Sequence, residues 1–172
     1  HNARDSIFSE LEGEIQVRAS MDVRVIGGEA PFTFSQIGHG GANADGNFSG
    51  HIKVGAQNDM EVAAMNPSVG AYAKIGHGDD YRSAFGVGLN GFSGSGTRSG
   101  DIQVGAGEDL DLRLALIGHA NSESPVTSNE GNTYVAVSRN DETDGNGAIR
   151  ANSLAEISSG SDDELRVYAP GK

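Results

Sequence analysis

The chain has 172 residues, a formal net charge of −12 and no cysteine, which excludes disulfides, thiolate metal sites and cysteine nucleophiles. The acidic balance argues against nucleic-acid binding, which needs clustered Lys and Arg, and against binding to anionic membrane surfaces. Glycine is frequent, at 26 residues, and the apolar share is 36%, so we expect a narrow core. No apolar run approaches the roughly 18 residues that a membrane-spanning helix needs.

The first recurring block in chain order is Gly-x-Ile-x-Val, at 13–17, 50–54 and 100–104. Apolar and polar residues alternate in each copy, which is typical of a half-buried strand. A short helix in the opening stretch "RDSIFSELEGEIQV" is an alternative, but Ile15 fits the strand register of the later copies better. We therefore expect a core ladder made of Ile15, Val17, Ile52, Val54, Ile102 and Val104.

A second block is an alternating run that begins eight residues after the Ile of the first block, at 23–25, 60–62 and 110–114. The turn before it has a fixed length in all three copies: "RASMD", "GAQND" and "GAGED". Three unrelated segments would rarely agree in this way, so the chain is predicted to be a repeat protein.

The third block is Ile-Gly-His, and its histidines are His39, His77 and His119. If equivalent strands stack, these side chains form a ladder. One interpretation is a metal-binding or proton-responsive site, because neutral imidazole binds Zn, Cu or Ni. We favour a structural ladder, in which each ring hydrogen-bonds a backbone group of a turn and stacks on the next ring. Acid should then weaken the stack.

These blocks predict an all-β fold, a right-handed parallel β-helix (β-solenoid) with about three strands per coil and roughly four to five coils. Residues 1–172 would form a single domain with coils at approximately 1–36, 37–74, 75–116 and 117–172. In the last coil we expect strands within 133–138, 148–157 and 164–169. The segment 149–157, "IRANSLAEI", is similar to "IQVRASMDV" at 15–23 in its residues and in the spacing of its apolar positions.

The segments 72–78, 99–107 and 110–114 together resemble the repeat arrays of large bacterial surface proteins of the autotransporter-passenger and filamentous-haemagglutinin-like type. The resemblance covers most of residues 10–140. It implies an exported, extended protein used for adhesion, biofilm or a cell-surface coat.

Several loops are rich in Asp, Asn and Gly, and oxygen-rich loops of this kind can hold calcium. The nearest to such a site is "DETDGNG" at 141–147, with Asp141 and Asp144 as candidate ligands. No loop fits the EF-hand or the calcium-binding nonapeptide pattern, so we favour solvated turns. The expected cofactor is none, with Ca²⁺ as the open alternative.

Enzymatic motifs do not stand out from the repeat. Outward acids and bases such as Asp101, Asp111 and Arg113 could serve a polysaccharide lyase or hydrolase, but they arise from the repeat pattern itself. The aromatic residues of the long 79–99 insertion could form a ledge that binds sugar or protein, or could cover a face of the solenoid.

The sequence therefore predicts a non-enzymatic extracellular structural protein at a bacterial cell surface. It would form a fibre or rod by end-to-end self-association, or as part of a longer repeat protein, with a role in adhesion or a surface matrix. The alternatives are a passenger fragment that binds glycans or host surfaces and, third, a polysaccharide lyase or hydrolase. Nucleic acid and membrane insertion are not expected.

Overall fold

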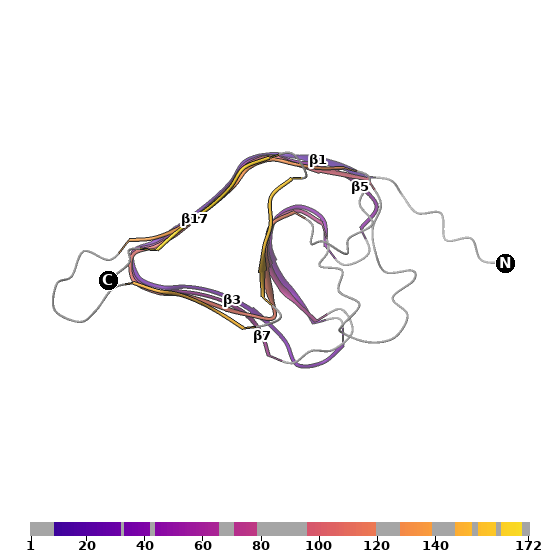
Figure 1. Ribbon diagram of the computed structural model, residues 1–172. Coiled ribbons are helices and arrows are strands. Elements are labelled where there is room, and N and C mark those ends of the chain that lie inside the picture. Colours follow the sequence, from indigo (N-terminus) through magenta and orange to yellow (C-terminus); the bar gives the residue numbers. More distant parts are fainter. Residues whose placement is uncertain are drawn as a thin grey trace.

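The computed structural model of the protein describes residues 9–31, 33–41, 44–65, 71–78, 96–119, 128–138, 147–152, 155–160 and 163–169. Within these ranges the chain is all-β, and its strands pair in parallel in four stacked sheets (Figure 1). This arrangement is consistent with the predicted parallel β-solenoid. The described residues include no helix long and apolar enough to cross a membrane.

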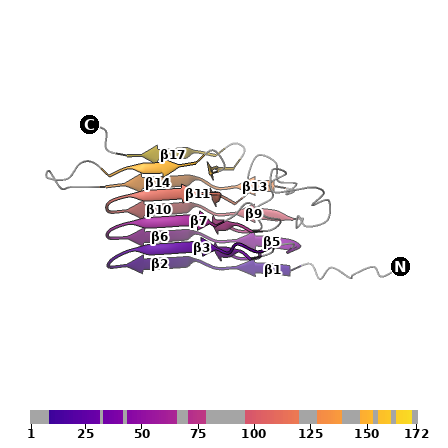
Figure 2. The ribbon, with the colours of Figure 1, turned by 90° about the horizontal axis from the view of Figure 1, so that it is seen from below.

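Up to Ile157, the described strands visit four sheets in a fixed order, and strands from successive visits lie side by side (Figure 2). Sheet A contains β1 (Ser9–Glu12), β5 (Gly46–Ser49), β9 (Thr97–Ser99) and β13 (Ser128–Glu130). Sheet B contains β2 (Ile15–Ala19), β6 (Ile52–Ala56), β10 (Ile102–Ala106), β14 (Thr133–Val137) and β17 (Leu165–Tyr168). Sheet C contains β3 (Val23–Gly27), β7 (Met60–Ala64), β11 (Leu110–Arg113) and β15 (Ile149–Ala151). Sheet D contains β4 (Ser35–Ile37), β8 (Ala73–Ile75), β12 (Ala115–Ile117) and β16 (Glu156–Ile157).

The expectation of about three strands per coil is wrong, because the described chain has four sheets. Sheets B, C and D correspond to the three sequence blocks. The three blocks do not include sheet A, because its inward row mixes unlike side chains and so shows no apolar alternation. That row runs through Leu11, Phe48, Arg98 and Asn129.

The tail forms strands in all three predicted segments. However, 148–157 contributes two short strands, β15 and β16, to two different sheets. The echo of 15–23 in 149–157 does not reflect equivalent positions, because Ile149 pairs with Leu110 of sheet C. The helix alternative near the beginning is also wrong for the described residues, since Ser9–Glu12 is strand β1.

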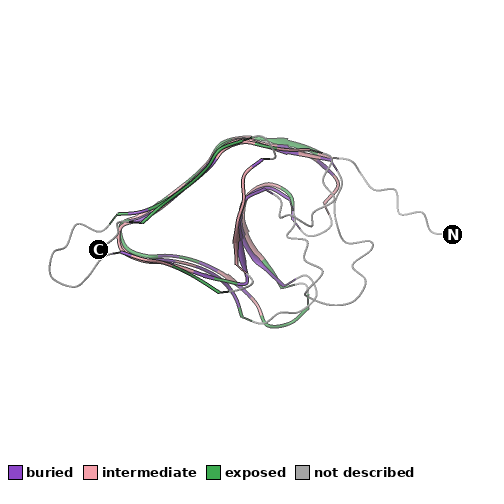
Figure 3. Ribbon diagram, in the orientation of Figure 1, coloured by how far each residue is buried: buried purple, intermediate pink, exposed green. Residues whose placement is uncertain are grey.

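An apolar column fills the space between sheets B, C and D. Ile52 pairs in register with both Ile15 and Ile102, and Val54 with both Val17 and Val104. All six residues of the expected core ladder belong to this column or pack against it. Burial alternates along β6 and β10 of sheet B, as a core on one face requires, whereas β8 and β12 of sheet D are buried throughout (Figure 3).

Candidate functional site

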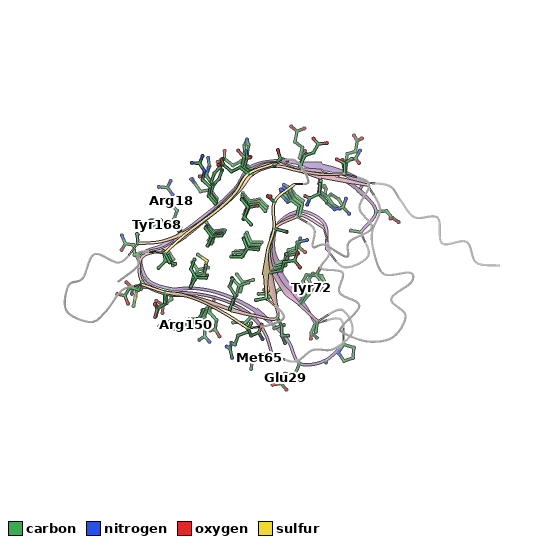
Figure 4. The ribbon with its side chains drawn as sticks, viewed as in Figure 1. Arg18, Glu29, Met65, Tyr72, Arg150 and Tyr168 are labelled. Carbon is green, nitrogen blue, oxygen red and sulfur yellow. The ribbon has the colours of Figure 1, made fainter. Side chains whose placement is uncertain are left out.

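Sheet D separates two interiors of different chemistry. Ala73 and Ile75 of β8 belong to the apolar column, whereas the side chain of Lys74, between them, points to the opposite face of the sheet. That face looks toward the inward row of sheet A, and Tyr72 lies at its margin (Figure 4). We call this second interior the histidine column, because the three predicted histidines lie in it.

The histidine column is a stack of nearly parallel imidazole rings. The ring centroids of His39 and His77 are 5.0 Å apart with an interplanar angle of 6°, and those of His77 and His119 are 4.7 Å apart at 2°. These separations match the spacing of about 4.8 Å between hydrogen-bonded strands, so each of three successive rungs contributes one ring.

Backbone hydrogen bonds occupy both ring nitrogens of the two inner histidines. The Nδ1 of His77 accepts the backbone N–H of His39 at 2.9 Å, and its Nε2 lies 2.9 Å from the carbonyl oxygen of Gly50. The Nδ1 of His119 accepts the N–H of His77 at 3.1 Å, and its Nε2 lies 2.6 Å from the Gly100 carbonyl. An Nδ1 that accepts must be unprotonated, so each ring is neutral and donates from Nε2.

The same contacts determine what this site can do chemically. Coordination of a metal through His77 or His119 would have to displace a backbone N–H or carbonyl partner. Protonation would place two N–H donors head to head at Nδ1. The arrangement therefore suits holding adjacent rungs together, and it opposes metal ligation and acid–base chemistry at these two rings.

Burial lowers the pKa of His77 from 6.5 to about 4, and the charges of His39, Lys74 and Arg98 add to this effect. Burial and the neighbouring His77 lower the pKa of His119 from 6.5 to about 3. The hydrogen bond from each ring to its glycine carbonyl opposes the shift, but the loss of hydration outweighs it. Both histidines are thus neutral in the folded protein at neutral pH.

Two fully buried cations lie beside the rings. The Nζ of Lys74 donates to the carbonyls of His77 at 2.8 Å and His119 at 2.6 Å. Arg98 donates from Nη1 to the carbonyl of Gly46 at 2.6 Å, and its guanidinium lies 4.5 Å from the ring centroid of Phe48. Sequence reasoning missed both. Lys74 lies between apolar neighbours, where a polar residue is normally read as solvent-facing, and Arg98 lies in the polar stretch "GTRSG" at 96–100.

The glycines of the motif make this packing possible. A Cβ on Gly76 would overlap the carbonyl oxygen of Gly118 on the next rung, and a Cβ on Gly38 would overlap that of Gly76. A Cβ on Gly78, whose φ is +73°, would strike the Arg98 guanidinium, while one on Gly40 would strike the ring of Phe48. Each residue of Ile-Gly-His-Gly thus has a structural role: Ile packs in the apolar column, both glycines clear space, and His links rungs.

A further ladder lies at the corner before sheet C, on the last residue of the fixed-length turns. Asp22 Oδ1 accepts the N–H of Asp59 at 3.4 Å, and Asp59 Oδ1 accepts that of Asp109 at 3.0 Å. Asp109 Oδ1 then accepts the N–H of Ala148 at 2.9 Å. The sequence signal was the recurring final Asp of "RASMD", "GAQND" and "GAGED".

The remaining predicted site residues fall outside the described residues or lie on different parts of the fold. Asp141 and Asp144 lie outside the described residues, as does most of the 79–99 insertion. Asp101 precedes β10, and its Oδ1 accepts hydrogen bonds from the backbone N–H and the side-chain amide of Asn132. Asp111 lies on sheet C. Among the described residues, no group of three or more His, Cys, Asp or Glu side chains is placed to hold a metal ion.

Comparisons of the chain with protein-family models, with curated proteins and with solved structures found no match. The resemblance to bacterial surface-protein repeat arrays therefore stays a prediction.

Proposed function

We propose that the protein is a non-enzymatic structural protein of the extracellular space or bacterial cell surface, and that it forms an extended rod or fibre by stacking of β-solenoid coils. The proposal includes a right-handed winding of four to five coils and a role in adhesion or a surface matrix. It also includes kinship with the autotransporter-passenger and haemagglutinin-like arrays.

The observation that carries this proposal is the contrast between inner and outer rungs of sheet B. The core side chains Ile102 and Val104 are buried, whereas Leu165 and Val167, which continue the rows of these two residues in β17, are 44% and 50% exposed. At the other end of the sheet, Ile15 is only partly buried. An apolar row that reaches solvent at the edge of a sheet invites another rung.

Strand pairing supplies a second reason. β2 and β17 are the outermost strands of sheet B, so each pairs on one side only within the described chain. The free backbone groups of such an edge can pair with another strand. In a second copy stacked in register, β2 would continue β17 and place Val17 next to Val167.

Electron microscopy and size-exclusion chromatography of the 172-residue chain test this proposal. We expect filaments, or species that lengthen with protein concentration. Val167→Asp should stop assembly, because a charge would be buried at the junction, and Tyr168→Ser, on the outward side of the same strand, is the matched control. Isolated short rods at high concentration, or filaments of Val167→Asp equal to those of the parent, would contradict the proposal.

A further inference from the structure

A shallow groove crosses the outer face of sheet B, away from both interiors. Its volume is about 630 Å³, and it runs over β2, β6, β10 and β14. Gly55, Gly105 and Ala136 lie in register along its floor, between Arg18 of β2 and Tyr168 of β17. Arg18 and Tyr168 lie on the outer side of sheet B (Figure 4). From these features we propose that the groove binds an uncharged linear polysaccharide lying along the solenoid axis. This inference goes beyond the structural role and does not depend on it.

The floor glycines are not needed for the fold. A Cβ on Gly55 would meet nothing within 4 Å, and one on Gly105 would meet only the Ala136 carbonyl oxygen, at 3.9 Å. By contrast, a Cβ on Gly50 or Gly100, at the corner before sheet B, would overlap the backbone of the neighbouring rung. Glycine inside a strand reduces stability, and it often marks a place where a ligand approaches the backbone closely.

The walls provide polar groups suited to hydroxyls. Lys53, Gln103 and Tyr134 line the groove, and Gln57 lies between it and an adjoining hollow that Asn58 and Ser138 also line. Amide and phenol groups both donate and accept hydrogen bonds, as sugar hydroxyls require. A largely apolar lining with a few polar groups is the usual composition of a ligand site.

The charges of the groove favour a neutral ligand. Lys53 pairs with Glu14 at 3.0 Å and lowers the pKa of that carboxyl group, and Arg166, above the Tyr134 ring, pairs with Glu164 at 2.6 Å. These two cations are thus balanced by carboxylates, whereas Arg18, at one end of the row, has no ion pair among the described residues. The net charge of −12 on the chain would also repel a polyanion.

The length of the groove favours a polymer. Neighbouring strands are spaced about 4.8 Å apart, so a floor that crosses successive rungs offers an elongated track instead of a closed pocket. A single sugar ring would cover only part of that track.

Native affinity gels containing hydroxyethyl cellulose, glucomannan or pullulan test the proposal, with polygalacturonate and alginate as charged counterparts. We expect retardation by at least one neutral polymer and none by the polyuronates. Gly55→Val and Gly105→Val fill the floor with residues that suit strands, and each should weaken binding about tenfold or more, a loss of about 1.4 kcal/mol or more. Ser49→Val and Ser99→Val make the corresponding change on the outer face of sheet A and should leave binding unchanged.

Thermal unfolding followed by circular dichroism shows whether each variant is folded. Gln103→Ala, which removes a wall amide without touching the floor, replaces any floor variant that fails to fold, and it too should weaken retardation. Absence of retardation in every neutral polymer, retardation only by polyuronates, or undiminished binding by folded floor variants would overturn the inference. These results do not depend on filament formation, so failure here is distinguishable from failure of the proposed structural function.

Discussion

The apolar column and the histidine column run through the same rungs but are held together differently. In the apolar column, Val23, Met60 and Leu110 occupy equivalent positions, since dispersion and the hydrophobic effect have no direction and accept different shapes. In the histidine column, the same Ile-Gly-His triplet returns unchanged at 37–39, 75–77 and 117–119. Hydrogen bonds require particular distances and angles, so few other side chains could replace these histidines. The strict return of Gly-His is thus explained by directional contacts between rungs, whereas the apolar column repeats Ile and Val in some rows and mixes residues in others.

The largest single-residue effect is expected in the apolar column. Ile102 is fully buried between Ile52 and Thr133 of the adjacent rungs, so Ile102→Ala leaves a cavity. It should lower the free energy of unfolding by about 2–5 kcal/mol, measured by urea denaturation. A loss below about 1 kcal/mol would show that the apolar column is loosely packed. Close packing would then not be what holds this column together, and the comparison with the hydrogen-bonded histidine column would fail.

The histidine column should respond to acid. Unfolded His77 and His119 take up protons near pH 6.5, whereas in the folded chain their pKa values are about 4 and about 3. The unfolded state therefore binds more protons as the pH falls below 6.5, and stability is lost until about pH 4 for His77 and about pH 3 for His119. Each ring should contribute a loss of about 1.4 kcal/mol per pH unit.

Urea denaturation between pH 6 and 5, where most carboxylates are still ionised, measures this slope. His77→Asn removes one of the two titrating rings and should reduce the slope by about 1.4 kcal/mol per pH unit. Equal slopes for the parent and the variant would show that the ring of His77 is not held neutral by its backbone partners.

A smaller effect is expected for the lysine beside the rings. Lys74→Met keeps most of the side-chain volume but removes the donor to the carbonyls of His77 and His119. Stability should fall by about 1–3 kcal/mol, the cost of leaving buried acceptors without that donor. A matched Leu116→Met change, at the equivalent position of the next rung, should cost less than about 1.5 kcal/mol. Equal losses would assign the role of Lys74 to packing alone.

The smallest effect is expected outside both columns. Glu61 on sheet C pairs with Arg24 at 2.8 Å and also with Arg113, and both arginines are mostly exposed. Glu61→Gln should cost about 0–1 kcal/mol, and the difference from the parent should shrink in 1 M salt. A larger, salt-independent loss would show that the outer face contributes to the fold as the columns do.

The strands of sheets B, C and D could be predicted because their inward residues are apolar and recur with a period of two. Sheet A could not, since its inward row passes from Leu11 through Phe48 to Arg98 and Asn129. The histidines could be predicted as a stacked set from their shared position in the repeat. The partners that fix their protonation state, the carbonyls of Gly50 and Gly100, could not, because they come from another block of the repeat.

The sequence by itself determined the repeat, the strand alternation and the equivalence of the three Ile-Gly-His copies, since all are local patterns that follow from strand geometry. Only the tertiary structure decided that a fourth sheet closes a second interior, and that Lys74 and Arg98 lie buried within it. The physical reason is that a strand has two faces. Alternation separates the side chains of the two faces, but whether the second face meets water or another sheet depends on how the whole chain winds.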